Sequence, residues 1–279
     1  MKQPPKLPEE ILHEILSCAL LVSPQDFLRC RPDPFERRTP RETPDRNSQL
    51  LLVPKNWLRA GTPLLYASVE LSQTKHTSAV AKLLREHPDV GAAVRSLRLE
   101  GGLTKDLAHV ARHTPNLRGL FISLWIQSSQ TTTGLEHALP LFAPTDLYVE
   151  LRIPIRTTTS IRTTTSKKAV EARQLLFSHV ARTWVSLRTV TLGPFCAVAL
   201  SADIRTALAS SSMEELRCHA RDLRAFIVRG TMESILESGR VSRITCFGAL
   251  AEGRLRDLLH KEGLSEHLHK FTFVPDPQT

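Results

Sequence analysis

A short apolar pattern that recurs along most of the chain restricts the possible folds more than any other feature of the sequence. The pattern is apolar-x-x-apolar-x-apolar, and the alternation in its second half is typical of a β-strand with one buried side. Most neighbouring copies lie 23 to 28 residues apart, which leaves room for one strand and one helix. The middle residues of the copies are Leu97, Leu120, Leu147, Val190, Leu216, Ile244 and Phe271, of which Leu147 belongs to a weaker copy.

The segments between these copies have the spacing of apolar residues that is typical of helices. The letters HVAR begin at His109 and again at His179, and in both places the next copy of the pattern starts eight residues later. The sequence therefore predicts leucine-rich-repeat-like units, in which each strand and helix stacks on its neighbours. The clearest expected helices cover residues 78–86, 105–113, 169–184, 202–210 and 253–262.

One interval is 43 residues long because it contains a duplicated segment. Ile-Arg-Thr-Thr-Thr-Ser occurs at residues 155–160 and again at residues 161–166. A basic, hydroxyl-rich segment without apolar alternation has little to bury, so we predict an exposed threonine-rich loop at about residues 155–168. An insertion without a role of its own is the preferred interpretation. Phosphorylation, or binding to an acidic surface, is the alternative.

The N-terminal stretch LPEEILHEIL, residues 7–16, predicts an amphipathic helix. Its apolar residues lie on one helical face, and Pro8 suits the first turn, where a missing N–H is no loss. Glu9 and Glu10 would lie at the positive end of the helix dipole.

A charged tract with five prolines interrupts the apolar signal at residues 23–49. No helical or strand period survives there, which predicts a disordered insertion. Apolar residues return over residues 50–71, where Gly61 and Pro63 predict a turn between two short helices. The expected structure is a module of three helices with a long insertion after the first.

This module resembles an F-box. The matching elements are Leu-Pro-x-Glu-Ile-Leu at 7–12, Leu-Leu-Val-x-Lys-x-Trp at 51–57 and Pro-Leu-Leu-Tyr at 63–66. Together with Val-Arg-Ser-Leu-Arg-Leu-Glu-Gly-Gly at 94–102, they make roughly the first 150 residues similar to the F-box proteins expanded in mushroom-forming fungi. Pro54 departs from the family pattern, which usually has a small residue there. An interior proline costs about 3 kcal/mol, so the second helix either begins at Pro54 or is damaged.

The resemblance implies a substrate-recognition adaptor of a cullin–RING (SCF-type) ubiquitin ligase. The F-box helices would dock on the adaptor subunit that joins them to the cullin, and the repeats would bind an unknown protein substrate. The first alternative, which is based on Pro54, is a repeat scaffold that has lost docking to the ligase. The residues expected at the docking surface are Leu7, Pro8, Ile11, Leu12, Ile15, Leu16, Leu51, Val53, Trp57 and Leu64.

The predicted fold class is α/β, with a small helical F-box-like module followed by an irregular leucine-rich-repeat-like solenoid of alternating short strands and helices. The module would occupy residues 1–70, including the disordered insertion at about 23–49, and the repeat domain would occupy residues 71–279.

Substrates are expected on the side of the strands that faces away from the leucine positions, because alternate residues of a strand point to opposite sides. Basic residues gather in the later copies, so an acidic or phosphorylated segment is the expected ligand there. Ordinary solvated arginines are the alternative. The residues singled out on this side are Arg98, Phe121, Tyr148, Arg217, His219, Arg243 and Lys270.

Composition narrows the remaining classes of function. Lys and Arg number 37 against 28 Asp and Glu, and this net charge of +9 permits nucleic-acid binding as a second alternative. Aromatic residues make up only 5% of the chain and no nucleic-acid-binding motif occurs, so that alternative is unlikely. Five scattered cysteines indicate a reducing compartment, and no run of about 18 apolar residues could span a membrane. We therefore expect a cytoplasmic or nuclear protein.

Motifs of catalysis are not found. The sequence has no glycine-rich phosphate loop and no hydrolase nucleophile elbow. His109 and His113 have the spacing of two metal ligands on one helix, but a third ligand is not evident, so packing at the helix end is preferred. The prediction is a protein that is not an enzyme and that has no cofactor or metal.

Overall fold

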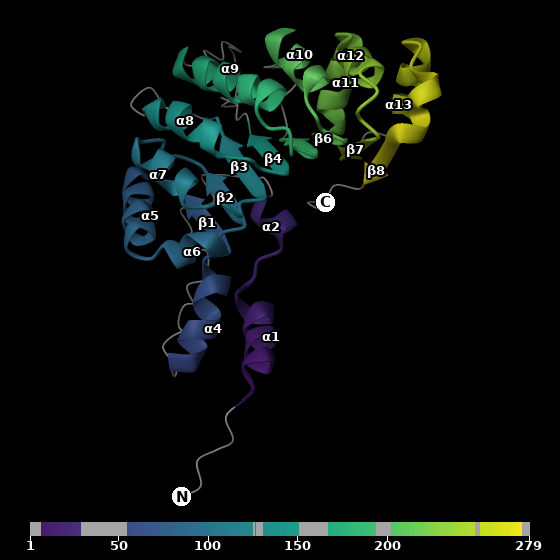
Figure 1. The fold of residues 1–279 in the computed structure, drawn as a ribbon. Coiled ribbons are helices and arrows are strands. Elements are labelled where there is room, and N and C mark those ends of the chain that lie inside the picture. The colour runs from purple at the N-terminus through teal and green to yellow at the C-terminus, as the bar shows by residue number, and fades with distance from the viewer. Residues whose placement is uncertain are drawn as a thin grey trace, which may run out of the picture.

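The structure is a computed structural model, which describes residues 7–28, 55–124, 126, 131–150, 167–193, 202–248 and 252–274. Its centre is one sheet of eight parallel strands, in which each strand lies beside the next strand of the sequence (Figure 1). The strands are β1 (Ser68–Leu71), β2 (Ser96–Leu99), β3 (Gly119–Ser123), β4 (Asp146–Glu150), β5 (Thr189–Leu192), β6 (Glu215–His219), β7 (Arg243–Phe247) and β8 (Phe271–Val274).

The recurring apolar pattern sets the register of this sheet. The seven predicted pattern centres lie in one row across β2 to β8, which starts with the pair Leu97 and Leu120 and ends with the pair Ile244 and Phe271. The third apolar residue of each copy forms a second row on the same side, because residues two apart on a strand share a side. Both rows belong to the main hydrophobic core, in which only Phe273 of these residues is partly exposed.

Helices cover the side of the sheet on which the two apolar rows lie. Figure 1 shows most of them following the outer side of the curved sheet, and all five expected helices are confirmed within three to four residues at their ends. They are α5 (Thr74–Glu86), α6 (Pro88–Ala93), α7 (Asp106–Arg112), α8 (Thr133–Ala138), α9 (Lys167–Arg182), α10 (Ala202–Ser210), α11 (Ala220–Val228), α12 (Thr231–Glu237) and α13 (Glu252–Lys261), with the 3-10 turns η3 (Leu139–Leu141) and η5 (Ser265–Lys270).

The short helices α6, α8, α11 and α12 were not predicted individually. In two of them, a glycine lies directly against the backbone of a neighbouring segment. A Cβ on Gly91 of α6 would overlap the carbonyl oxygen of His113, and a Cβ on Gly134 of α8 would overlap that of Thr104. Glycine therefore lets these helices approach the neighbouring backbone, which is a contact that helix propensity does not reveal.

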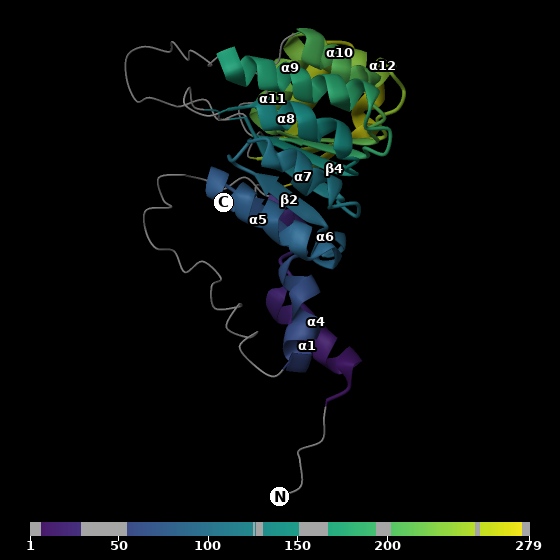
Figure 2. The same ribbon diagram turned by 60° about the vertical axis from the view of Figure 1, so that its left-hand side comes forward.

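A second, smaller core joins α1 (Glu9–Leu20) to α4 (Lys55–Leu65). Both helices lie side by side at one end of the molecule in Figures 1 and 2. The expected turn at Gly61 and Pro63 is wrong, because both residues lie inside α4. Pro63 removes one backbone hydrogen bond in the last turn, where the loss is small. The buried residues of this core are Leu12, Leu16, Leu20, Ala60 and Leu64.

The helix α2 (Pro24–Leu28) lies on the opposite side of the sheet from the helices of the main core, next to β2 and β3 (Figure 1). Its position differs from the predicted disorder of residues 23–49, of which residues 29–49 lie outside the described part. Five residues are too few for a stable helix in water, so contacts with the sheet must hold α2 in place. One contact is a close fit to Gly119, where an added Cβ would lie 2.8 Å from Cδ1 of Leu28.

The predicted fold class, a helical F-box-like module followed by a leucine-rich-repeat-like solenoid, is wrong. The structure is an α/β fold on one eight-stranded parallel sheet, and both predicted parts contribute to it. Strand β1 begins at Ser68, inside the predicted module, and pairs with β2. Tyr66, two residues before β1, and Val69 and Leu71 within it carry the same apolar pattern, in a stretch where the sequence predicted short helices. The predicted threonine-rich loop at 155–168 falls outside the described residues, except that Lys167 and Lys168 begin α9.

We predict that Gly119→Val displaces α2 from the sheet. A larger side chain would fill the space of Leu28, whereas valine suits a strand and should leave β3 intact. Amide hydrogen exchange over residues 24–28 should become faster by about tenfold. The matched control is Gly253→Val, because a Cβ on Gly253 meets nothing within 4 Å. Equal exchange in the two variants would show that the contact at Gly119 does not hold α2.

Candidate protein-binding surfaces

Helix α1 divides its apolar residues between two faces. Leu12 and Leu16 are each only 1% exposed, because they pack against α4. Leu7, Ile11 and Ile15 are 47%, 47% and 48% exposed, although they are equally apolar. A step of one residue turns the helix by about 100°, so the two rows lie on adjacent faces. The sequence placed all five residues at one docking surface, and the structure leaves three of them accessible.

The remaining predicted docking residues also differ in how exposed they are. Pro8 is exposed and forms the N-cap of α1, where its carbonyl accepts a bond from the amide of Leu12 at 3.1 Å. Trp57 is half-buried against the small core, and Leu64 is buried within it. Leu51 and Val53, like Pro54, lie outside the described residues. Among the described residues, the exposed large apolar side chains on or next to this helix pair are Leu7, Ile11, Ile15, Leu21, Val22 and, from α4, Leu58.

The predicted substrate side of the sheet is called the strand face here. Its central row runs across neighbouring strands and consists of Glu70, Arg98, Phe121, Tyr148, Thr191, Arg217, Thr245 and Thr272. These side chains point away from the main core, because each alternates with a residue of the buried rows. The row contains four of the seven residues that the sequence singled out for substrate binding.

Arg98 lies on the strand face, yet its side chain is fully buried. Its Nε atom lies 2.7 Å from Oε1 of Glu100, and its Nη1 atom donates a hydrogen bond of 2.8 Å to the backbone carbonyl of Phe27 in α2. The guanidinium carbon lies 3.7 Å from the centre of the Phe121 ring. A buried charge needs such partners, and α2 supplies one of them. This part of the strand face is thus covered by the chain itself.

Aromatic side chains continue the covered region. Phe121 is fully buried, and its ring stacks on the half-buried ring of Tyr148, with centroids 4.9 Å apart. The cation and the two rings therefore form one packed row over β2, β3 and β4. A ligand could reach Tyr148 directly but could reach Arg98 and Phe121 only after α2 had moved.

The later strands carry a network around Glu215. Oε2 of Glu215 lies 2.9 Å from Nη2 of Arg217, and its Oε1 accepts a hydrogen bond of 2.7 Å from the hydroxyl of Thr245. Burial would raise the pKa of Glu215, but the hydrogen bonds from Arg217 and Thr245 and the charges of Arg217 and Arg243 outweigh it, so the pKa lies below its ordinary value. Glu215 is therefore a carboxylate that holds Arg217 in place on the strand face.

Three further predicted residues lie on or beside the strands that carry this network. Arg243 is exposed and lies beside Glu215 in the register of β6 and β7. Lys270 is partly exposed directly before β8. His219 is half-buried at the end of β6, where a Cβ on Gly248 would lie 2.7 Å from its Nε2 atom. The structure therefore places Arg217, His219, Arg243 and Lys270 on or beside the last three strands, pairs Arg217 with an acid, and leaves Arg98 on β2.

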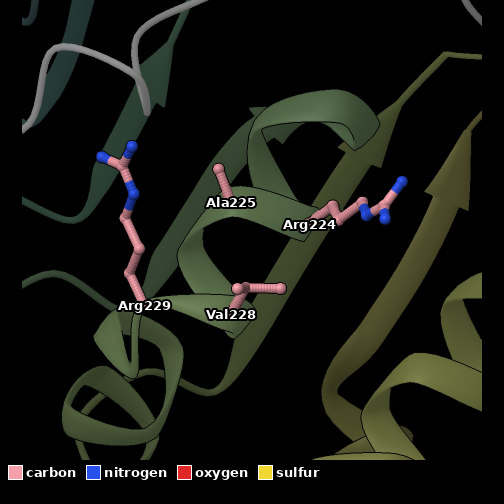
Figure 3. Close-up of a pocket in the computed structure, with 4 residues that line it drawn as sticks. All are labelled: Arg224, Ala225, Val228 and Arg229. Atoms are coloured by element: carbon pink, nitrogen blue, oxygen red, sulfur yellow. The ribbon is translucent and has the colours of Figure 1, made fainter.

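A hollow of about 300 Å³ on the helix side is lined by Arg224, Ala225, Val228 and Arg229 of and beside α11. Figure 3 shows Val228 between the two arginines, whose guanidinium groups point to opposite sides of the helix. Because the two guanidinium groups point apart, they cannot bind one anion together. The hollow therefore does not form a bidentate anion-binding site.

The histidine pair at the end of α7 packs as expected for a helix end. The rings of His109 and His113 lie 4.1 Å apart, and Nδ1 of His113 is 2.9 Å from the carbonyl oxygen of His109. Burial, followed by the neighbouring charges of His113, Arg85 and Arg112, lowers the pKa of His109 despite Asp106. No group of three or more possible metal ligands occurs in the described residues. None of the described helices is long and apolar enough to cross a membrane.

Comparison with the models of known protein families found no match, and comparison with characterised proteins found none either. The resemblance to F-box proteins therefore stays a prediction that depends on the motifs at residues 7–12, 51–57, 63–66 and 94–102.

Sequence reasoning missed several residues that shape the strand face. Glu215 had a signal, since it lies two residues before Arg217 and must share its side of the strand. Phe27 and Leu28 gave only a short apolar interruption in a polar tract. Gly119 had no local signal, because its role depends on contact with a residue far away in the sequence.

We predict that Glu215 stabilises the fold at neutral pH and less so in acid. A carboxyl with a lowered pKa in the folded state adds stability above its unfolded pKa, near the ordinary value of 4.5, and this stability is lost as the pH falls through the lower folded pKa. Chemical denaturation at neutral pH and in acid measures the free energy of unfolding. Relative to wild type, Glu215→Gln should lose more of it at neutral pH than in acid. Glu214→Gln is the control, because Glu214 is exposed on the same strand end. A deficit that does not depend on pH would contradict the proposed network.

Proposed function

We propose that the protein is a substrate-recognition adaptor of a cullin–RING ubiquitin ligase, which docks through the α1–α4 pair and binds a protein substrate on the strand face. The observation that carries the proposal is the exposed apolar row of Ile11 and Ile15 on α1, continued by Leu7 just before the helix, beside a buried row on the same helix. The F-box resemblance, at residues that include this row, supports the identity of the partner. The proposal assigns no catalysis, cofactor or metal to the chain.

The exposed row is suited to docking rather than to folding. Leu12, Leu16 and Leu20 already fill the small core with α4, so the exposed row contributes little to it. Burying a large aliphatic side chain is worth about 1.5–3 kcal/mol, and a half-exposed one can still gain about half of that. Two or three such residues at the centre of an interface can dominate its affinity. An apolar partner groove would therefore gain from this row without unfolding the helix pair.

The rest of the proposal concerns partners and location. The adaptor subunit would join the chain to the cullin, and the substrate would meet the part of the strand face that α2 leaves uncovered. The proposal places the protein in the cytoplasm or nucleus. Cys18, Cys218 and Cys246 are free thiols, which suits a reducing compartment.

We predict that Ile11→Asp combined with Ile15→Asp abolishes co-purification of the ligase adaptor subunit. Both side chains are exposed, so the double variant should stay folded, whereas two buried carboxylates would weaken docking by at least about a hundredfold. The measurement is pull-down of recombinant adaptor subunit from a mushroom-forming fungus, with circular dichroism to verify folding. The matched control is Leu141→Asp, an exposed apolar residue away from α1.

Leu12→Asp tests the buried face of α1. A carboxylate there would lie in the small core, so we expect α1 and α4 to separate and become sensitive to proteases. If the wild-type chain does not bind the adaptor subunit, ligase docking is wrong and the scaffold alternative replaces it. If the double variant binds as well as wild type, the exposed row is not the docking surface.

A further inference from the structure

The strand face carries two arginines in the same row, each paired with a carboxylate two residues away on its own strand. Arg98 pairs with Glu100 on the β2 side, and Arg217 pairs with Glu215 on β6. The register connects them through Phe121, Tyr148 and Thr191. Since residues two apart on a strand share a side, both pairs belong to the strand face.

One of these arginines already binds a peptide segment. Nη1 of Arg98 donates to the carbonyl of Phe27 at 2.8 Å, while Glu100 holds Nε at 2.7 Å. Leu28 of the same helix fits against Gly119, where a Cβ would be 2.8 Å away. The carboxylate thus fixes the guanidinium, and the guanidinium offers its other donors to an acceptor on a short peptide turn. This contact shows how the strand face can recognise a segment.

Arg217 has the same kind of internal support but is more accessible. Its side chain is 33% exposed, whereas that of Arg98 is fully buried. Glu215 holds Nη2, and within the described residues the buried Nε atom has no hydrogen-bond acceptor. Because the buried Nε atom is closed to other molecules, a ligand would meet the terminal nitrogens of this partly exposed guanidinium.

We propose that Arg217 forms an open peptide-binding site on the strand face, which takes a carboxylate from an acidic segment of a protein partner. This inference rests on the proposed function, because it specifies the class of substrate. Arg243 and Lys270 add two positive charges, against the single negative charge of Glu215, which favours a carboxylate over a neutral carbonyl. Thr191 and Thr272 flank Arg217 and Thr245 in the row and can donate or accept further hydrogen bonds.

The test uses the full chain and two fluorescent peptide pools, one with Glu at every second position and one with Gln there instead. Fluorescence anisotropy should show the Glu pool binding at least about tenfold more tightly. Arg217→Gln should remove this preference. Arg217→Lys should also lose most of it, because lysine keeps the charge but not the fork geometry. The matched control is Arg182→Gln, an exposed arginine of α9, which should bind like wild type.

Glu215→Gln gives a result of opposite sign. The glutamine oxygen can still accept a hydrogen bond from Arg217 and hold it in place, but the competing negative charge is gone, so the Glu pool should bind about threefold to tenfold more tightly. If Arg217 and Glu215 were only structural, both changes would weaken binding. Equal binding of the two pools, a loss in Arg182→Gln as large as in Arg217→Gln, or wild-type binding by Arg217→Lys would each overturn the proposal.

A single-stranded DNA oligonucleotide serves as a third probe. If it binds more tightly than the Glu pool and depends equally on Arg217, the site takes nucleic acid and the proposal is overturned. Ligase docking is scored separately, since Ile11→Asp with Ile15→Asp should leave peptide binding unchanged. If the wild-type chain binds the Glu pool but not the adaptor subunit, the docking is rejected and the Arg217 site is kept. If it binds the adaptor subunit but shows no preference for the Glu pool, the site alone is rejected.

Discussion

The parallel ladder of apolar residues is the constraint on which the rest of the structure depends. Each strand places two apolar side chains on the same side, and neighbouring strands bring them into two continuous rows. Because these rows must be buried, all helices of the main core lie on that side. The other side is then free to carry charged and aromatic residues, since nothing in the main core requires it to be apolar. Every candidate residue of the strand face owes its position to this division.

The two ends of the strand face are used differently. Over β2 and β3, α2 buries the guanidinium of Arg98, which would otherwise face water. Gly119 leaves the space that Leu28 of α2 occupies. Over β6 and β7, a similar guanidinium is held by Glu215 and stays accessible. Burial of a charge is tolerable only with compensating partners, so the covered end is specific for one internal segment. The open end can exchange its partners with solvent or with another protein.

Local periodicity explains what the sequence could predict. The centres from Leu97 to Phe271 and the five main helices follow from patterns of two and of about 3.6 residues, and these elements are confirmed. Strand β1 has the same pattern, but the F-box resemblance led us to include this stretch in a helical module. The site of α2 could not be predicted, because its energy comes from Leu28 meeting a glycine on β3 rather than from its own residues. The division of α1 into buried and exposed rows likewise required the position of α4.

Sequential strand order also has a consequence for how the chain folds. Paired residues of neighbouring strands lie between 23 positions apart, as for Leu97 and Leu120, and 43 positions apart, as for Leu147 and Val190. No pairing in the described sheet joins the two ends of the chain, so each step closes a short loop. Low contact order of this kind favours rapid folding. The contact of α2 with β3 spans 91 positions from Leu28 to Gly119, and it is therefore expected to form late, on a sheet that is already complete.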